Sequence, residues 1–76
     1  MKLDILIKKI ESLAGFIGFD YLGKACGIDP INHSHYEMWC GENYKVANSI
    51  DEVMNIKLFE GKALAQIYKD IDNIEY

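Results

Sequence analysis

The chain has 76 residues, half of them hydrophobic, and a formal net charge of −4 from 8 basic and 12 acidic residues. This length allows one small domain, residues 1–76, and the hydrophobic content argues against intrinsic disorder. The chain has no arginine, whereas proteins that bind nucleic acid directly usually present clustered lysine and arginine, so direct binding of nucleic acid is not expected.

Charged residues recur through residues 1–11, which interrupts the apolar core that a signal peptide needs. The longest uncharged run near the N-terminus is too short to cross a bilayer. Two cysteines, Cys26 and Cys40, in a chain without an export signal are expected to stay reduced. We therefore expect a cytoplasmic protein that has no membrane partner.

The N-terminal segment has the periodicity of a helix. Hydrophobic residues recur at three- and four-residue steps through residues 3–17, which predicts an amphipathic helix. The stripe could continue as one long helix through Ala25. Gly15 and Gly18 weaken that alternative, because each glycine costs about 1 kcal/mol relative to alanine inside a helix. We expect a break at these glycines and a short second helix over residues 20–27.

Residues 34–48 are rich in aromatic and strand-favouring residues on either side of Gly41-Glu42-Asn43, which predicts a β-hairpin. Residues 28–34 before the hairpin contain Pro30 and are expected to form a loop. Trp39 should lie on the more polar face of the hairpin. There it is either covered by a second helix or exposed as an aromatic anchor for a partner.

Two registers of this hairpin compete. A two-residue turn would pair Met38 with Lys45 and Glu37 with Val46, which mixes charged and apolar residues on both faces. A three-residue loop instead separates the hairpin into an apolar and a more polar face. The apolar face would carry Tyr36, Met38, Cys40, Tyr44 and Val46, and the other His35, Glu37, Trp39, Lys45 and Ala47. We favour the three-residue loop, because one apolar face specifies the register.

The last third of the chain predicts two helices. The sequence Ser49-Ile50-Asp51-Glu52 is a capping pattern and predicts a short helix through about Asn55. Residues 61–72 carry a helical stripe that could cover the hairpin. The predicted fold class is α+β: an N-terminal helix, possibly followed by a second, then a two-stranded antiparallel β-hairpin, a short helix and a C-terminal amphipathic helix.

The segment SIDEVMNIKLFEGKALAQIYKDI, residues 49–71, resembles the tail of small acidic prophage-type accessory proteins of low-GC Gram-positive bacteria. In those proteins a strand is followed by a "(D)SIDE-hydrophobic" turn of helix, an "IFDGKSL"-like connector and an amphipathic end. Ala63 stands here where serine is common. The resemblance covers less than a third of the chain. It implies a phage or mobile-element accessory protein acting in a bacterial host cell, and it transfers no site residue.

Four residues of metal-ligand type lie close in the sequence: Cys26, His33, His35 and Cys40. Zinc is bound by thiolate and imidazole, so a small metal-stabilised regulator is one alternative. The chain has no C-x-x-C knuckle, and the odd spacing of His35 and Cys40 turns them to opposite faces of a strand. We therefore expect no metal and no cofactor.

Nothing in the sequence marks a catalytic site. A Cys–His nucleophilic pair would need an orienting carboxylate and an oxyanion site, and neither is indicated. Gly61-Lys62 lacks the upstream glycine of a phosphate-binding loop. The chain is therefore not expected to be an enzyme.

The functional expectation is a non-enzymatic protein-binding module that inhibits a larger host defence protein, for example an anti-CRISPR protein that blocks a basic nucleic-acid-binding surface. Acidic groups would steer it toward that surface, and an aromatic side chain would anchor it. The candidate contact residues are Glu37, Trp39, Glu42, Asp70, Asp72 and Glu75. The alternative is a homodimeric structural or regulatory protein of phage origin, because an open sheet edge favours pairing with a second copy.

Overall fold

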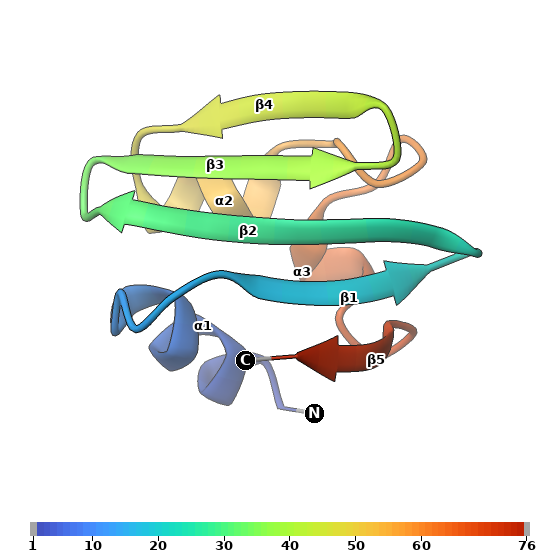
Figure 1. Cartoon of the computed structure of the whole chain (residues 1–76), viewed down its shortest axis with the longest axis horizontal. Coiled ribbons are helices and arrows are strands. Elements are labelled where there is room, and N and C mark those ends of the chain that lie inside the picture. The colour runs from blue at the N-terminus through green and yellow to red at the C-terminus, as the bar shows by residue number, and fades with distance from the viewer. Residues whose placement is uncertain (1, 76) are drawn as a thin grey trace.

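The computed structural model describes residues 2–75, which form one antiparallel sheet and a layer of short helices (Figure 1). The elements in chain order are α1 (Leu3–Glu11), β1 (Ile17–Tyr21), β2 (Lys24–Asn32), β3 (His35–Cys40), β4 (Asn43–Ala47), α2 (Ile50–Asn55), α3 (Leu64–Ile67) and β5 (Asp72–Glu75). The strand order is β4-β3-β2-β1-β5. The first four strands thus form a meander, and β5 returns from the helical layer to pair with the free edge of β1.

The predicted architecture is wrong in its balance of helix and strand. The chain builds a five-stranded sheet where a two-stranded hairpin was expected. The helix predicted over residues 61–72 is reduced to α3, and the chain then continues as β5. The positive φ of Asn73, 53°, lies within this last strand, next to its irregular pairing with β1.

The second predicted helix, over residues 20–27, is replaced by the β1–β2 hairpin. Burial in β1 alternates, with Ile17, Phe19 and Tyr21 buried, which is the period of a half-buried strand and not of a helix. The hairpin turn is Leu22-Gly23, with φ values of 51° and 79°, and two consecutive positive φ values suit the twist of a two-residue hairpin.

The loop predicted over residues 28–34 is also wrong, because β2 continues to Asn32. Pro30 is tolerated in this strand for a specific reason. The pairing of β2 with β1 ends at Ile28, so β2 at Pro30 is paired only with β3 and one side of its ladder is free. A proline without an N–H fits such a position.

The hairpin predicted over residues 34–48 is present as β3 and β4, but the favoured register is wrong. Cys40 pairs with Asn43 and Met38 with Lys45, so Gly41-Glu42 forms a two-residue turn. Gly41 has a φ of 61°, as such a turn requires. The expected alternation of apolar residues did not specify the register. β4 is an edge strand, so Lys45 can point to the helical side of the sheet and still remain exposed to solvent.

Two predicted helix starts are observed. α1 begins at Leu3 but ends at Glu11 and not near Ile17, and a φ of 55° at Leu13 turns the chain toward β1. Ser49 caps α2 as expected, since its hydroxyl accepts a hydrogen bond of 3.1 Å from the Glu52 amide. The Glu52 carboxylate in turn accepts a bond of 2.9 Å from the Asn48 amide.

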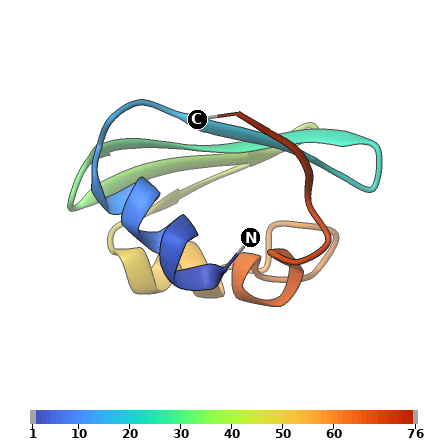
Figure 2. The ribbon, with the colours of Figure 1, turned by 90° about the horizontal axis from the view of Figure 1, so that it is seen from below.

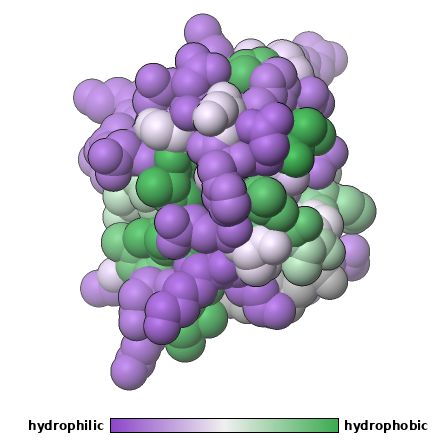
Figure 3. All heavy atoms as spheres, turned by 90° about the vertical axis from the view of Figure 1, so that its left-hand side faces the viewer, coloured by the Kyte–Doolittle hydropathy of each residue, from purple (hydrophilic) through white to green (hydrophobic). Residues whose placement is uncertain are grey.

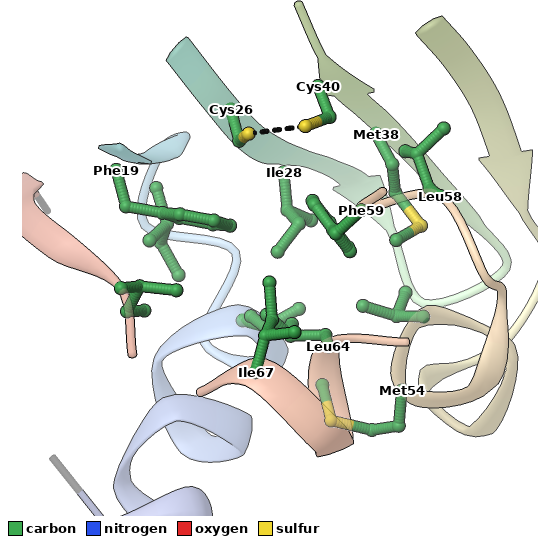
Figure 4. Close-up of a cluster of buried hydrophobic side chains, with 14 of the residues drawn as sticks. Phe19, Cys26, Ile28, Met38, Cys40, Met54, Leu58, Phe59, Leu64 and Ile67 are labelled. Carbon is green, nitrogen blue, oxygen red and sulfur yellow. Dashed lines mark hydrogen bonds between the residues drawn. The ribbon is translucent and has the colours of Figure 1, made fainter. Parts of the chain in front are cut away.

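All three helices lie on the same side of the sheet, so the described chain has two layers (Figure 2). The core fills the space between them and combines buried residues of β1 to β4 with residues of the helices and of the loop before α3 (Figure 4). Its fully buried members include Tyr36, Phe59, Leu6, Ile10, Ile28, Met38, Leu64 and Ile67. No helix within residues 2–75 is long and apolar enough to cross a membrane.

Candidate functional site

The sheet face opposite the helices, here called the outer face, is not covered by any described element (Figure 2). The strand registers place one row of residues across all five strands on this face. The row runs from β4 to β5 as Tyr44, Trp39, Gly27, Gly18 and Glu75. This central row has aromatic side chains at one end, two glycines in the middle and a carboxylate at the other end.

The two glycines of the central row are covered by aromatic rings. The indole of Trp39 lies over Gly27, where an added Cβ would come within 2.7 Å of the ring carbon Cη2. Phe16, in the segment before β1, lies over Gly18, with its ring carbon Cε2 3.3 Å from an added Cβ. The centroids of the two rings are 6.3 Å apart and their planes are tilted by 48°. Glycine at both positions therefore lets two aromatic side chains lie against the sheet.

Trp39 was expected either beneath a second helix or exposed as an anchor. No described helix covers it, and the ring of Phe16 lies beside it in a tilted arrangement. Phe16 itself is 53% exposed and Tyr44 55% exposed, which is unusual for aromatic side chains of this size. The outer face thus presents a row of aromatic side chains, here called the aromatic row, in which Phe16 and Tyr44 are exposed and Trp39 is partly buried.

A hollow of about 260 Å³ lies beside the aromatic pair. Its aromatic wall is formed by Phe16 and Trp39, and Asp20 and Glu75 contribute carboxylates. Asn73 holds Asp20 in place by donating a 2.9 Å hydrogen bond from its side-chain amide to the Asp20 carboxylate. The hollow exists because β5 docks beside β1 and brings residues 73 and 75 next to residues 16–20.

Acidic pairs flank the central row on both sides. Asp29 on β2 is the register partner of Glu37 on β3, and Asp20 on β1 is the register partner of Asp72 on β5. Like charges directly opposite each other on neighbouring strands destabilise a sheet. Folding alone therefore does not account for these carboxylates on one face.

His35 and Tyr44 both interact with Glu37. The Nε2 atom of His35 lies 3.3 Å from the Glu37 carboxylate. The pKa of the Tyr44 phenol is raised above its ordinary value by desolvation, and further by the charge of Glu37 and a hydrogen bond to it. Both contacts orient the Glu37 carboxylate on the outer face, between the histidine and the tyrosine.

None of the eight lysines occupies an outward-pointing strand position. Lys24 and Lys45 lie opposite Tyr21 and Met38, whose side chains are buried on the helical side. The other six belong to segments of the helical layer or to its connections: Lys2, Lys8, Lys9, Lys57, Lys62 and Lys69. The outer face thus carries carboxylates without lysines, whereas the helical side carries the lysines together with other carboxylates such as Asp4 and Asp51.

A second, larger hollow of about 420 Å³ lies at the β4 edge on the helical side, lined by Lys45, Lys57 and Glu60 among others. Glu60 is already paired with Lys24. Seen from the side, hydrophobic residues are interspersed with hydrophilic ones and do not form one continuous patch (Figure 3). That side of the molecule therefore offers no apolar patch to compare with the aromatic row of the outer face.

The structure separates the six predicted contact residues into two groups. Four belong to the sheet: Glu37 and Trp39 on β3, and Asp72 and Glu75 on β5. Glu42 lies in the β3–β4 turn, away from the central row. Asp70 follows α3, where its amide donates a 2.7 Å bond to the carbonyl of Ile67, so it belongs to the helical side.

The four candidate metal ligands do not converge. Cys26 and Cys40 are buried on the inner face of the sheet, whereas His35 lies on the outer face beside Glu37. His33 lies at the other end of β2, with its Nε2 atom 3.0 Å from the carbonyl oxygen of Glu11. Within residues 2–75 no group of three or more histidine, cysteine or acidic residues is placed to hold a metal ion. The same separation leaves neither cysteine beside a histidine.

Several residues of the outer face were not predicted. Phe16, Gly18 and Gly27 were assigned to a helix or a helix break, and Asp29 to a loop. The usable signal was the alternation of Ile17, Phe19 and Tyr21 with smaller or polar residues, which marks a strand with one open face.

Comparisons with known proteins found no relative of this chain. No family model matches the sequence, and searches of curated proteins and of solved structures found no match.

Proposed function

We propose that this protein is a non-enzymatic binding module whose outer sheet face docks onto a basic surface of a larger protein. One observation carries the proposal: an uncovered sheet face on which an aromatic row lies between acidic pairs, without any lysine. Interfaces of proteins are enriched in tryptophan and tyrosine at their centre, with a polar rim around them. The outer face has the same distribution.

The chemistry of the hollow specifies a cationic contact. A lysine or arginine side chain that enters it would meet the rings of Phe16 and Trp39 and the carboxylates of Asp20 and Glu75. A cation over an aromatic ring gains about 0.5–1 kcal/mol at an exposed site and about 2 or more when desolvated. Arginine fits best, because its flat guanidinium can stack on a ring and bind a carboxylate at the same time.

The size of the face is adequate for a specific complex. The sheet extends along the two longer dimensions of the molecule, 28 and 22 Å (Figure 1). Their product is about 600 Å², which approaches the roughly 800 Å² that each partner buries in an interface of standard size. A flat face of this area can therefore cover a groove on a larger protein.

The specific form that we propose is an anti-defence inhibitor of phage or mobile-element origin, acting in the cytoplasm of a bacterial host cell. It would occupy a basic nucleic-acid-binding surface of a host defence protein, as an anti-CRISPR protein does. The carboxylates beside the central row would then contact the lysines and arginines that otherwise bind phosphates. The prophage-like segment 49–71 and the acidic outer face support this form.

The test uses immobilised wild-type protein and two charge-matched variants. Asp29→Asn/Glu37→Gln removes two charges from the outer face, and Asp4→Asn/Asp51→Asn removes two exposed charges from the helical side. A partner from a bacterial lysate qualifies if the wild type and the helical-side variant retain it and the outer-face variant loses it. The purified partner should then lose its affinity for DNA or RNA when the protein is added. Equal retention by both variants, or a partner that still binds nucleic acid, would contradict the proposal.

A second copy of the chain is the competing occupant. β4 is an edge strand. Its free edge has no partner strand among the described residues, and pairing of this edge with a second copy would form a dimer. Analytical ultracentrifugation over a range of concentrations separates the two cases. A dimer that dissociates when Trp39 is replaced by alanine would assign the outer face to self-association instead of to a partner.

A further inference from the structure

Cys26 and Cys40 form a buried pair of thiols between the adjacent strands β2 and β3, at the C-terminal end of β3 (Figure 4). They are direct register partners on β2 and β3, and their sulfur atoms are 2.7 Å apart. Their side chains are 2% and 1% exposed. The two residues are fourteen positions apart in the sequence, so only the strand register brings them together.

The hydrogen-bond ladder shows which kind of pair this is. In an antiparallel ladder, hydrogen-bonded and non-hydrogen-bonded pairs alternate. The amide of Gly41 donates a 2.9 Å bond to the carbonyl of Ala25, its opposite position, so this neighbouring pair is a hydrogen-bonded one. Cys26 and Cys40 therefore occupy a non-hydrogen-bonded pair, in which the Cα atoms are about 4.5 Å apart. That separation lies within the range of disulfides, roughly 4.4–6.8 Å.

We infer that Cys26 and Cys40 are an intramolecular oxidation site, at which a low-molecular-weight disulfide such as oxidised glutathione converts the two thiols into one disulfide between β2 and β3. In the first step one cysteine thiolate attacks a sulfur of the small disulfide and expels one small thiol. In the second step the other cysteine attacks the mixed disulfide and expels the second small thiol. One S–S bond is broken and one is formed in the exchange, and two electrons and two protons pass from the protein to the small disulfide.

The native environment makes this reaction slow but its product durable. Burial, together with the hydrogen bond to Cys40, raises the pKa of the Cys26 thiol to about 12, so little thiolate forms at neutral pH. The exchange then proceeds through local opening at the Gly41 end of β3. Once formed, the disulfide is shielded from external thiols by the same burial.

The bridge would strengthen the sheet directly beneath the proposed docking face. The next register pair after Cys26 and Cys40 is Gly27 and Trp39, whose side chain points to the outer face. A bridge on the inner face therefore holds together the two strands that support the tryptophan without occupying the outer face. Under oxidising conditions the module would keep its binding surface and resist unfolding.

The test starts from purified, fully reduced protein in glutathione redox buffers. Intact-mass spectrometry is expected to show a monomer that has lost two hydrogen masses, and peptide mapping should show Cys26 joined to Cys40. The oxidised protein should melt about 10 °C or more above the reduced protein, and the gain should disappear on reduction. Glutathione adducts on both cysteines, disulfide-linked dimers or a lower melting temperature after oxidation would overturn the inference.

Comparing how readily the disulfide forms in the folded and in the unfolded chain shows whether the fold favours the bond. The alternative is that the two cysteines pair only because they are near each other in the sequence. The squared concentration of reduced glutathione divided by that of oxidised glutathione, at the point where half of the pair is oxidised, is measured in buffer and again in denaturant, because two reduced glutathiones form for each oxidised one consumed. The folded protein should form the disulfide about a hundredfold more favourably than the unfolded chain. Equal values would show that the fold does not favour the bond, and the inference would fail. No variant is needed for this comparison, so it does not depend on whether a cysteine substitution folds.

Discussion

Trp39 and Gly27 face each other across β3 and β2, and the indole of Trp39 covers the backbone of Gly27. A Cβ at position 27 would lie 2.7 Å from Cη2 of the indole and 2.8 Å from the carbonyl oxygen of Ile17. Glycine is therefore the residue that allows the tryptophan to lie against the sheet. The position of the aromatic row depends on this absent side chain.

Gly27→Ala is expected to lower the free energy of unfolding by about 1–3 kcal/mol, because the methyl group must displace the indole or the strand. The sign is informative, since alanine in a strand interior is normally more favourable than glycine by roughly 0.5–1 kcal/mol. Urea unfolding and tryptophan fluorescence measure the two effects. Gly18→Ala is the matched control, because its Cβ would approach closely only the exposed Phe16 ring, at 3.3 Å, and would lie at an ordinary 3.9 Å from the Cys26 carbonyl oxygen. Equal stability of Gly27→Ala and the wild type would show that the ring does not lie over Gly27.

Neutralising Glu37 is expected to affect stability and binding in opposite directions. Glu37→Gln removes the repulsion from Asp29, its register partner, while the glutamine can still hydrogen-bond His35 and Tyr44, so the change should stabilise the sheet by about 0.2–1 kcal/mol at low salt. The same change removes a carboxylate from the outer face and should weaken binding to a basic partner. Denaturant unfolding and the affinity for that partner are the two measurements. Glu42→Gln in the β3–β4 turn is the control and should change neither appreciably. A Glu37→Gln protein that is destabilised, or that binds as well as the wild type, would count against the role assigned to this carboxylate.

Ser49→Ala tests the start of α2. The change removes the hydroxyl that accepts the amide hydrogen of Glu52 at 3.1 Å, and loss of such a cap costs about 1 kcal/mol. Equilibrium unfolding in urea measures the difference. Ser49→Asp is the control, because its carboxylate can accept the same bond and should retain most of the stability. A Ser49→Ala protein with an unchanged midpoint would mean that α2 depends on its buried residues Val53 and Met54 alone.

The stability of the reduced protein is expected to fall as the pH rises above about 9. In the unfolded chain Cys26 loses its proton near its ordinary pKa of 9.0, whereas burial raises the pKa to about 12 in the folded state. Between these values the unfolded chain binds fewer protons than the folded one, so unfolding releases a proton and becomes more favourable. The slope contributed by Cys26 should reach at most about 1.4 kcal/mol per pH unit.

Urea midpoints measured under reducing conditions across this pH range check the expected slope. The Cys26→Ala protein is the control and should lose the Cys26 component. Tyr36, whose pKa is also raised by burial, is present in both proteins, so its contribution cancels in the difference. Identical pH dependence of the two proteins would mean that Cys26 is not held protonated by the fold.

Local signals identified some elements of this fold and missed the sheet for physical reasons. The stripe of α1 and the Ser49 cap of α2 depend on neighbours within a few residues, and both were predicted. Leu64 and Ile67 have helical spacing and do lie on one helix, but that helix ends after one turn. The chain after it becomes β5 because β1 offers an open edge, and a polar segment such as Asp72–Glu75 has little strand preference of its own.

The candidate site was predictable only in part for the same reason. Trp39 and Glu37 share a face by simple alternation along one strand, so both could be named in advance. The hollow could not, because it joins Glu75 to Phe16 and Gly18 across a pairing between the two ends of the sequence. The register predicted for β3 and β4 was wrong because Lys45, which pairs with the buried Met38, is exposed at the sheet edge and so does not have to avoid the apolar side.

The position of β5 has a practical consequence for work with this protein. Glu75 lines the hollow on the outer face, whereas Lys2 leads into α1 in the helical layer (Figure 2). A purification tag or fluorescent fusion attached at the Glu75 end of the chain would begin beside the hollow and would obstruct access to the hollow. One joined to the N-terminus would start from the opposite layer, so reporters for interaction assays belong there.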